Sequence, residues 1–219
     1  MNINLFKTKR SKAYLLLHRS IQFVVNIILR LLFKIEIINR EKSFYKGKLI
    51  LCCNHFSALD PVLMGEYYPG PVYFMAKKEL FRKFFFRNLI EFLNAFPVNR
   101  SGVDRAAISK AVEVINSGNT IGIFPEGTRS SGEEIGKGHK GLALIAYLTG
   151  APILPMAVCN LKKVSHGRKK TIRPKIRIIF GDIINTEEFF RKYPKREGID
   201  MLSAYVIDDL KKLFSRINY

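Results

Sequence analysis

Cysteine and acidic residues are scarce in this chain, and proline is not abundant. Its three cysteines supply neither a disulfide framework nor the spacing of a metal site, which fits a reducing, cytosol-facing location. The nine prolines and the 47% of hydrophobic residues are ordinary values for a folded protein, so no disorder is implied. A chain of 219 residues is long enough to bury one sizeable core. Only 18 acidic residues oppose 37 lysines and arginines. The resulting charge of +19 indicates a polyanionic partner, whether nucleic acid, an anionic membrane surface or a phosphorylated substrate.

An uninterrupted apolar run long enough to span a membrane is also missing. Residues 13–33 are rich in Leu, Ile, Val and Phe, but polar residues recur at intervals of three and four and so share one stripe of a helix. This stripe interrupts the run of about 20 apolar residues that a spanning helix needs. We therefore expect residues 1–33 to form an amphipathic, membrane-associating helical segment whose basic stripe faces water and lipid phosphate. The stripe comprises Arg19, Gln22, Asn26 and Arg30.

The alternative for this segment is a helix packed on its own domain, since most amphipathic helices cover a core. A wide apolar face and a basic flank favour the membrane. No small-residue cleavage site follows the segment, so export is not expected. The flank contains Lys7, Lys9, Arg10 and Lys12.

The rest of the chain alternates short apolar runs with helical patterns, which is typical of an α/β fold. Because there is no repeat, low-complexity segment or second domain, we expect a single mixed, largely parallel sheet flanked by helices. Prolines in the run at residues 151–158 argue for an edge strand or a bulge there. Strands are predicted at residues 34–38, 48–53, 72–76, 120–124, 151–158 and 175–180, and helices at residues 60–68, 104–116, 142–149 and 201–217.

A histidine and an aspartate stand five residues apart where one predicted strand gives way to a helix. His55 follows the apolar run, and Asp60 with the next proline is typical of a helix start. Residues five apart do not face each other on a continuous helix, but a turn between them removes that objection. The Asp60 carboxylate can then accept from one imidazole nitrogen while the other takes a proton from a hydroxyl. A helix cap and a packed histidine explain the same residues, so the pattern alone leaves both interpretations open.

A second polar loop follows the predicted strand at residues 120–124. It reads Pro-Glu-Gly-Thr-Arg-Ser, and its glutamate and arginine stand where the strand ends. In open α/β sheets that edge is where ligands bind, and an arginine there can hold a phosphate bidentately.

Two further basic stretches have more than one interpretation. Residues 80–96 interleave six phenylalanines with lysine and arginine, a pattern that suits base stacking on nucleic acid, contact with acyl chains, or an ordinary core. Residues 162–175 contain seven lysines and arginines and no acid, which is typical of a solvated loop and also suits anionic lipid.

Taken in order, the motifs resemble the glycerophospholipid acyltransferase family, and most closely the 1-acyl-sn-glycerol-3-phosphate acyltransferases. The likeness covers roughly residues 48–158 and implies that residues 34–219 are an acyltransferase domain. It implies a catalytic pair of His55 and Asp60. In that family an Asp commonly precedes the arginine that corresponds to Arg100. This chain has Asn99 there, which puts in question how Arg100 is held. The residues that the resemblance implicates in acceptor binding are Lys77, Arg100, Glu126, Gly127, Thr128 and Arg129.

The resemblance also implies the reaction. A fatty acyl group would pass from acyl-CoA or acyl-carrier protein to the sn-2 hydroxyl of lysophosphatidic acid, giving phosphatidic acid in phospholipid biosynthesis. No cofactor, metal or nucleic acid is expected, and no acyl-enzyme, because a Gly-x-Ser-x-Gly elbow is missing. The expected location is the cytoplasmic face of the cell membrane, on a monotopic or peripheral protein.

Three other functions compete with this one. The motifs specify the chemistry better than the acceptor, so another lyso-lipid is the first alternative. A basic nucleic-acid-binding protein is the second, although no helix-turn-helix, zinc or RNA-recognition signature is present. A non-catalytic lipid-surface protein is the third, and intact His55 and Asp60 count against it.

Overall fold

The computed structural model describes residues 12–82, 84–99, 102, 104–130, 134–159, 173–193 and 195–218. Its strands are β1 (Lys34–Ile38), β2 (Leu49–Cys53), β3 (Val72–Lys77), β4 (Ala95–Val98), β5 (Thr120–Ile123), β6 (Ile153–Cys159) and β7 (Lys175–Phe180). Its α-helices are α1 (Lys12–Leu32), α2 (Asp60–Tyr67), α3 (Phe84–Phe92), α4 (Arg105–Asn116), α5 (Gly141–Thr149), α7 (Thr186–Lys192) and α8 (Lys195–Ser215). Two short 3₁₀ helices, η1 (Arg40–Ser43) and η2 (Lys78–Arg82), complete the elements.

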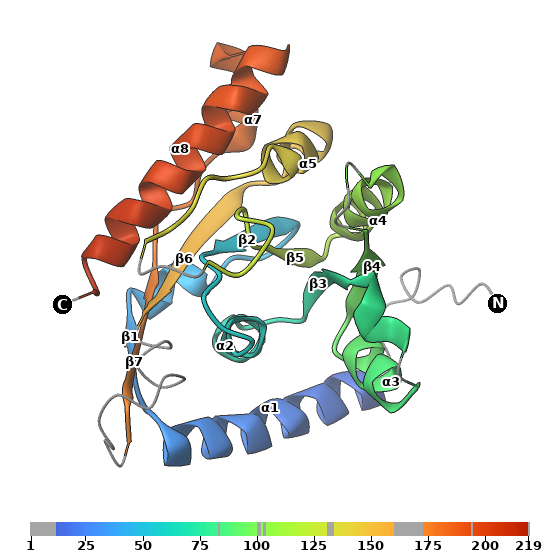
Figure 1. Cartoon of the computed structure of the whole chain (residues 1–219), viewed down its shortest axis with the longest axis vertical. Coiled ribbons are helices and arrows are strands. Elements are labelled where there is room, and N and C mark those ends of the chain that lie inside the picture. The colour runs from blue at the N-terminus through green and yellow to red at the C-terminus, as the bar shows by residue number, and fades with distance from the viewer. Residues whose placement is uncertain are drawn as a thin grey trace.

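The strands form one seven-stranded sheet in the order β1-β7-β6-β2-β5-β3-β4. Every neighbouring pair is parallel except β6 and β7, which are antiparallel. Helices α4, α5 and α8 lie on one side of this sheet, and α1 and α2 lie on the other (Figure 1). The predicted α/β fold with a single mixed, largely parallel sheet is therefore confirmed.

The central strand β2 explains why its sequence is apolar throughout instead of alternating. All five of its residues are buried, because helices cover both faces of the sheet. Ile50 and Cys52 pack into the core beneath α4, α5 and α8. Leu49, Leu51 and Cys53 pack into the core beneath α1 and α2. The strand is thus held from both sides, and its carboxyl end is a rigid base for the turn that follows.

The expectation that the prolines put residues 151–158 at an edge or a bulge is wrong, since β6 lies inside the sheet between β7 and β2. Pro155 pairs with Cys52 of β2, and its carbonyl oxygen accepts from the Gly181 N–H at 2.8 Å. In a strand, the N–H and the C=O of one residue point to the same side. The side of Pro155 that lacks an N–H therefore faces Gly181, just beyond Met156 and Phe180, the last residue pair between β6 and β7. A central strand tolerates proline where the neighbouring ladder stops.

Helix α1 corrects an expectation in part, because the two uncharged residues of its polar stripe turn toward the protein, while Arg19 and Arg30 are exposed. The Gln22 side chain donates to the Gly65 carbonyl at 2.8 Å, and Asn26 donates to the Glu66 carboxylate at 2.8 Å. Gly65 and Glu66 both lie in the last turn of α2. Main-chain carbonyl groups there, such as that of Gly65, lack partners within the helix. Leu29 is buried in the core, whereas eight other apolar side chains of α1 are exposed: Leu16, Leu17, Phe23, Val24, Ile27, Ile28, Leu31 and Leu32.

None of the helices in the described part of the chain is both long enough and apolar enough to cross a membrane. The basic flank at residues 7–10 and most of the basic run at residues 162–175 lie outside the described residues. In the phenylalanine-rich stretch, Phe96 is buried in the core, as the third interpretation of that stretch predicts.

Candidate active site

The turn after β2 begins with a buried amide that fastens it to β6. Asn54 is fully buried; its side chain donates to the Val158 carbonyl at 2.9 Å and accepts from the Val158 N–H at 2.8 Å. These two bonds continue the β2–β6 ladder through a side chain, so the backbone of the next residue is free to leave the sheet. The sequence signal for this junction is an asparagine directly after an apolar strand, a signal too common to predict the role by itself.

His55 and Asp60 meet across that turn. The imidazole Nδ1 lies 2.9 Å from Asp60 Oδ2, and the same oxygen accepts the backbone N–H groups of Phe56 and Ser57 at 2.7 Å each. Asp60 is fully buried, while His55 is 8% exposed. The pairing of His55 with Asp60 therefore has the predicted geometry, since this carboxylate orients the imidazole and closes the turn. The helix-cap interpretation of Asp60 is wrong, because the N-cap residue of α2 is Leu59, it makes no side-chain cap hydrogen bond, and Asp60 accepts from residues that precede the helix.

The imidazole has one nitrogen left for chemistry. Its ring stacks on Phe124, with centroids 4.1 Å apart and planes inclined by 20°. Among the described residues, Nε2 has no hydrogen-bond partner. With Nδ1 donating to the carboxylate, Nε2 carries the lone pair, which is the arrangement that a general base requires.

Glu126 joins the histidine turn to the loop after β5. This buried carboxylate accepts the His55 backbone N–H at 2.8 Å through Oε1. Its Oε2 accepts the Gly136 N–H at 3.0 Å and the Ser130 hydroxyl. The Ser130 N–H donates in turn to the His55 carbonyl at 2.9 Å. Both carboxylate oxygens of Glu126 therefore accept hydrogen bonds from the protein itself. We call these hydrogen bonds the Glu126 strut, because they fix the backbone at His55.

The tight turn beside this strut requires glycine. Gly127 has φ of +69°, in the left-handed region, and a Cβ there would lie 2.8 Å from the His139 ring. The two residues that follow, Thr128 and Arg129, have exposed side chains. They stand at the rim of the same loop.

The sheet topology places the other predicted residues along one edge. Strands β2, β5, β3 and β4 are mutually parallel neighbours, so their carboxyl ends share an edge. His55 follows β2, Glu126 to Arg129 follow β5, and Lys77 ends β3, half exposed and 3.8 Å from Glu79. Arg100 lies outside the described residues.

The chain just before Arg100 is held by another aspartate. Asp104 accepts the Asn99 N–H at 2.7 Å and caps α4 by accepting the Ala107 N–H at 3.0 Å. These backbone donors, that of Asn99 first, lower the pKa of Asp104. The carboxylate that fixes this segment thus comes from position 104, whereas Asn99 contributes its backbone N–H.

A comparison with known protein families gives a match that includes both loops of the site. Residues 34–159, more than half of the chain, match the family model described as Acyltransferase. The chain belongs to the acyltransferase family.

Relatives of this acyltransferase carry a more specific name. A 1-acyl-sn-glycerol-3-phosphate acyltransferase of Bacillus subtilis (strain 168) is 26% identical over 195 residues, which cover 89% of this chain and 95% of that protein. A protein of the same name from Borreliella burgdorferi is 34% identical over 129 residues, which cover 58% of this chain and 52% of that protein. In structure, the acyltransferase is similar to PlsC from Thermotoga maritima, with a TM-score of 0.77, 23% identity, and coverage of 97% of this chain and 85% of that chain. At 23% identity, the likeness to PlsC shows a shared fold alone.

The thiols next to the site of this acyltransferase are not nucleophiles. Burial raises the pKa of Cys52 well above its ordinary value, and the Asp209 and Glu126 carboxylates act in the same direction. Burial likewise raises the pKa of Cys53, with the Asp60 carboxylate adding to it. Both cysteines therefore remain thiols at neutral pH. A thiolate is not available beside His55, so an acyl-cysteine intermediate has no basis here.

Proposed function

We propose that this acyltransferase moves a fatty acyl group from acyl-CoA or acyl-carrier protein to the sn-2 hydroxyl of 1-acyl-sn-glycerol-3-phosphate. The product, phosphatidic acid, enters phospholipid biosynthesis. The proposal rests on one observation: the 2.9 Å contact between His55 Nδ1 and Asp60 Oδ2, on the turn after β2. The names of the relatives support this choice of acceptor.

In the proposed reaction His55 is the general base. Its Nε2 takes the proton of the sn-2 hydroxyl while Asp60 stabilises the imidazolium that forms. The alkoxide attacks the thioester carbonyl, the C–S bond breaks, and the imidazolium returns the proton to the leaving thiolate. An ester and a free thiol result, with no acyl-enzyme and no bound cofactor. A positioned base contributes about 10²- to 10⁴-fold, so orientation and oxyanion donors supply the rest.

The phosphate of the acceptor is the handle that orients the hydroxyl. Arg129 follows β5 and Lys77 ends the parallel neighbour β3, while Arg100 comes shortly after β4 in the sequence. Arginine can bind phosphate with two parallel hydrogen bonds, which fixes direction as well as distance. Gly127 and Thr128 would form the rim against which the phosphate lies. Glu126 serves the same site by holding His55.

The acceptor is an amphiphile, and α1 offers a route to it. Eight large apolar side chains of α1 are exposed on the described surface, facing away from α2. Such a face inserts at the boundary of headgroups and acyl chains, so the protein would be peripheral at the cytoplasmic face of the cell membrane. Gln22 and Asn26 would then fasten the catalytic domain to the embedded helix, while Arg19 and Arg30 stay exposed on the same helix.

The test is a transfer assay with purified full-length protein across a panel of lyso-lipid acceptors, each with acyl-CoA and with acyl-carrier protein. We expect the highest kcat/KM with lysophosphatidic acid. Arg129→Ala should raise the KM for this acceptor by about tenfold and leave an unphosphorylated lyso-lipid unaffected. An equal loss with both acceptors would contradict the phosphate role, and preference for another acceptor would replace the substrate.

A further inference from the structure

Phe124 lies directly after β5, and its ring forms one wall of the histidine site. Cys52 of β2 pairs with Ile123 of β5, so by the same register Phe124 comes next to Cys53. Both of these side chains belong to the core beneath α1 and α2. His55 is two residues beyond Cys53, and its ring stacks on that of Phe124 with centroids 4.1 Å apart and planes inclined by 20°. The stack therefore follows from the pairing of two neighbouring strands.

The hydrogen bonds of His55 leave one freedom to its ring. Its backbone is fixed, because its N–H donates to Glu126 at 2.8 Å and its carbonyl accepts from Ser130 at 2.9 Å. Within the described part of the chain, the imidazole has a single hydrogen bond, between Nδ1 and Asp60 Oδ2 at 2.9 Å. One such bond fixes the position of one ring atom, but the last torsion of a histidine side chain has broad minima. The plane of the ring, and with it the direction of Nε2, needs a second contact.

Asp60 does not supply that contact. Its Oδ2 already accepts the backbone N–H groups of Phe56 and Ser57 besides the imidazole. Its Oδ1 is buried and has no hydrogen-bond partner among the described residues. The carboxylate is thus held by the backbone of the turn and meets the imidazole through one oxygen alone. It orients Nδ1 and leaves the ring plane to another neighbour.

The ring of Phe124 has the geometry to fix that plane. Two nearly parallel rings at 4.1 Å are in van der Waals contact over their faces, so a tilt of the imidazole either loses this contact or drives its edge into the other ring. Phe124 also covers one face of the imidazole. A substrate hydroxyl therefore meets His55 at the Nε2 edge.

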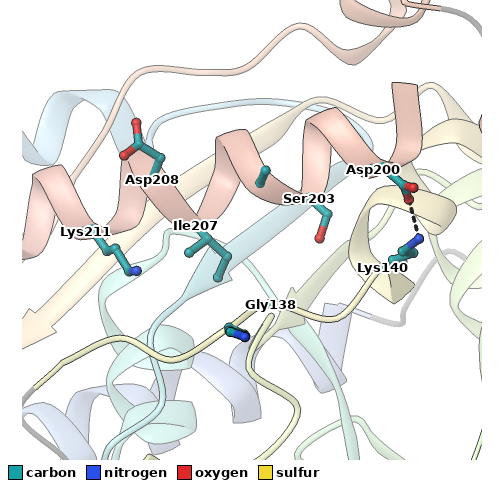
Figure 2. Close-up of a pocket in the computed structure, with 9 residues that line it drawn as sticks. Gly138, Lys140, Asp200, Ser203, Ile207, Asp208 and Lys211 are labelled. Atoms are coloured by element: carbon teal, nitrogen blue, oxygen red, sulfur yellow. Dashed lines mark ion pairs between the residues drawn. The ribbon is translucent and has the colours of Figure 1, made fainter. Parts of the chain in front are cut away.

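The backbone that carries Phe124 is itself well supported. Its carbonyl accepts from the Gly127 N–H at 3.0 Å, which closes the turn after β5. The same turn accepts the His139 N–H at the Pro125 carbonyl, at 2.8 Å. Figure 2 shows Ser203 and Ile207 of α8 projecting toward this supporting segment at Gly138. A Cβ on Gly138 would lie 2.6 Å from the Ile207 side chain, so the segment is packed closely against α8.

We propose that Phe124 is a positioning residue for the general base. Its ring sets the plane of the His55 imidazole and so aims Nε2 at the sn-2 hydroxyl of the acceptor. The inference rests on the proposed function, because it takes His55 as the base. In this role Phe124 contacts neither acceptor nor donor. Its loss should therefore lower kcat and leave the KM values of both substrates unchanged.

The first experiment replaces the flat ring by an apolar side chain that cannot stack. Phe124→Leu should lower kcat by about tenfold, because the reacting nitrogen is no longer held in line with the hydroxyl. Phe124→Tyr restores the ring at this partly buried position and should recover most of the lost kcat. Phe124→Met, a second variant without a ring, should behave like the leucine variant and serves where the latter does not fold.

Phe74→Leu is the matched control. Phe74 of β3 is also partly buried and packs against the same core, beside Gly122. This variant loses the same atoms from that core and should keep the kcat of the wild type. An equal fall in kcat in the Phe74 variant, a rise in either KM, or no recovery with tyrosine overturns the positioning role.

The stack also has a signature in NMR that requires no turnover. The ring current of Phe124 shifts the imidazole protons of His55 upfield. The chain contains four histidines, and His55→Ala identifies the resonance by its loss. This resonance should move downfield in Phe124→Leu and should stay in place in Phe124→Tyr and Phe74→Leu. A fall in kcat without a change in this resonance would assign the loss to the fold and overturn the inference.

Failure of this inference can be told from failure of the proposed function. A wild type that acylates lysophosphatidic acid, with a Phe124→Leu variant whose kcat and imidazole resonance are unchanged, refutes the positioning role alone. A wild type that shows the expected shifts but acylates no lyso-lipid refutes the proposed reaction, while the control of the ring plane by Phe124 stands.

Discussion

At the scale of single residues, His55 carries the proposed chemistry. His55→Ala should lower kcat by about 10²- to 10⁴-fold, because the base is lost while acceptor and donor still bind. The fold should survive with a loss of about 1–3 kcal/mol, since the variant loses the ring stacked on Phe124 and leaves the buried Asp60 carboxylate without one of its donors. Steady-state transfer and urea unfolding measure the two effects. Turnover retained in this variant would rule out the assignment of the base.

Glu126 gives a prediction that separates positioning from binding. Glu126→Gln replaces one buried acceptor by a donor that faces the N–H of His55 or Gly136. We expect a loss of about 1–3 kcal/mol in the free energy of unfolding and a fall in kcat with little change in the acceptor KM. Glu134→Gln, an exposed change in the same loop, is the control. If the acceptor KM rises instead while kcat holds, the carboxylate contacts the acceptor, as the family resemblance implies.

These two residues also show what the sequence could reveal. The approach of His55 and Asp60 was predictable, because both lie in one short turn whose ends are marked by an apolar run and a proline. The strut from Glu126 to the His55 backbone was not, because its partner is a main-chain N–H 71 residues away. A backbone donor leaves no signature in the sequence.

At the scale of elements, the contact between α1 and α2 contains a titrating group. Burial raises the pKa of Glu66, against the opposing effects of the Asn26 hydrogen bond and the Arg30 and Arg40 charges. The folded carboxyl therefore keeps its proton to higher pH than the unfolded one. Its contribution to stability is full below the ordinary value of 4.5 and declines as the pH rises through the raised pKa.

Glu66→Gln should remove this pH dependence. The amide oxygen still accepts from Asn26, while the charge that becomes costly at higher pH is gone. Relative to the wild type, the variant should gain stability between pH 4 and pH 7, as measured by urea unfolding at several pH values. Glu197→Gln, an exposed change on α8, should show no such gain. A relative loss for Glu66→Gln over that range would contradict burial as the dominant cause.

Most elements were predictable because both sheet faces are covered, which leaves apolar runs that are easy to locate. The order of the strands was not, since parallel pairing is set by contacts between distant segments. The inward direction of Gln22 and Asn26 on α1 was not predictable for a related reason. Periodicity shows that polar residues share a face, but whether that face meets water depends on acceptors elsewhere, here in the last turn of α2.

At the scale of the whole molecule, the proposed function requires that the catalytic domain and the lipid meet through α1. Figure 1 shows this helix along the margin of the molecule, on the α2 side of the sheet. The chain's formal charge of +19 adds attraction to anionic lipid, an attraction that salt weakens. The contributions of apolar contact and of charge to lipid binding can therefore be separated by experiment.

The apolar contribution is tested with Phe23→Ser and Leu31→Ser together, which remove side chains that are 68% and 69% exposed on α1. Binding to vesicles of phosphatidylglycerol and phosphatidylcholine, followed by sedimentation, should fall by at least about tenfold, because each side chain contributes about 1.5 kcal/mol or more when fully buried in lipid. The loss should persist at high salt, where charge is screened. Phe44→Ser with Met201→Ser removes exposed apolar side chains from other elements and should leave sedimentation unchanged. Equal losses in the two double variants would mean that nonspecific hydrophobicity, and not the face of α1, holds the protein on the vesicle.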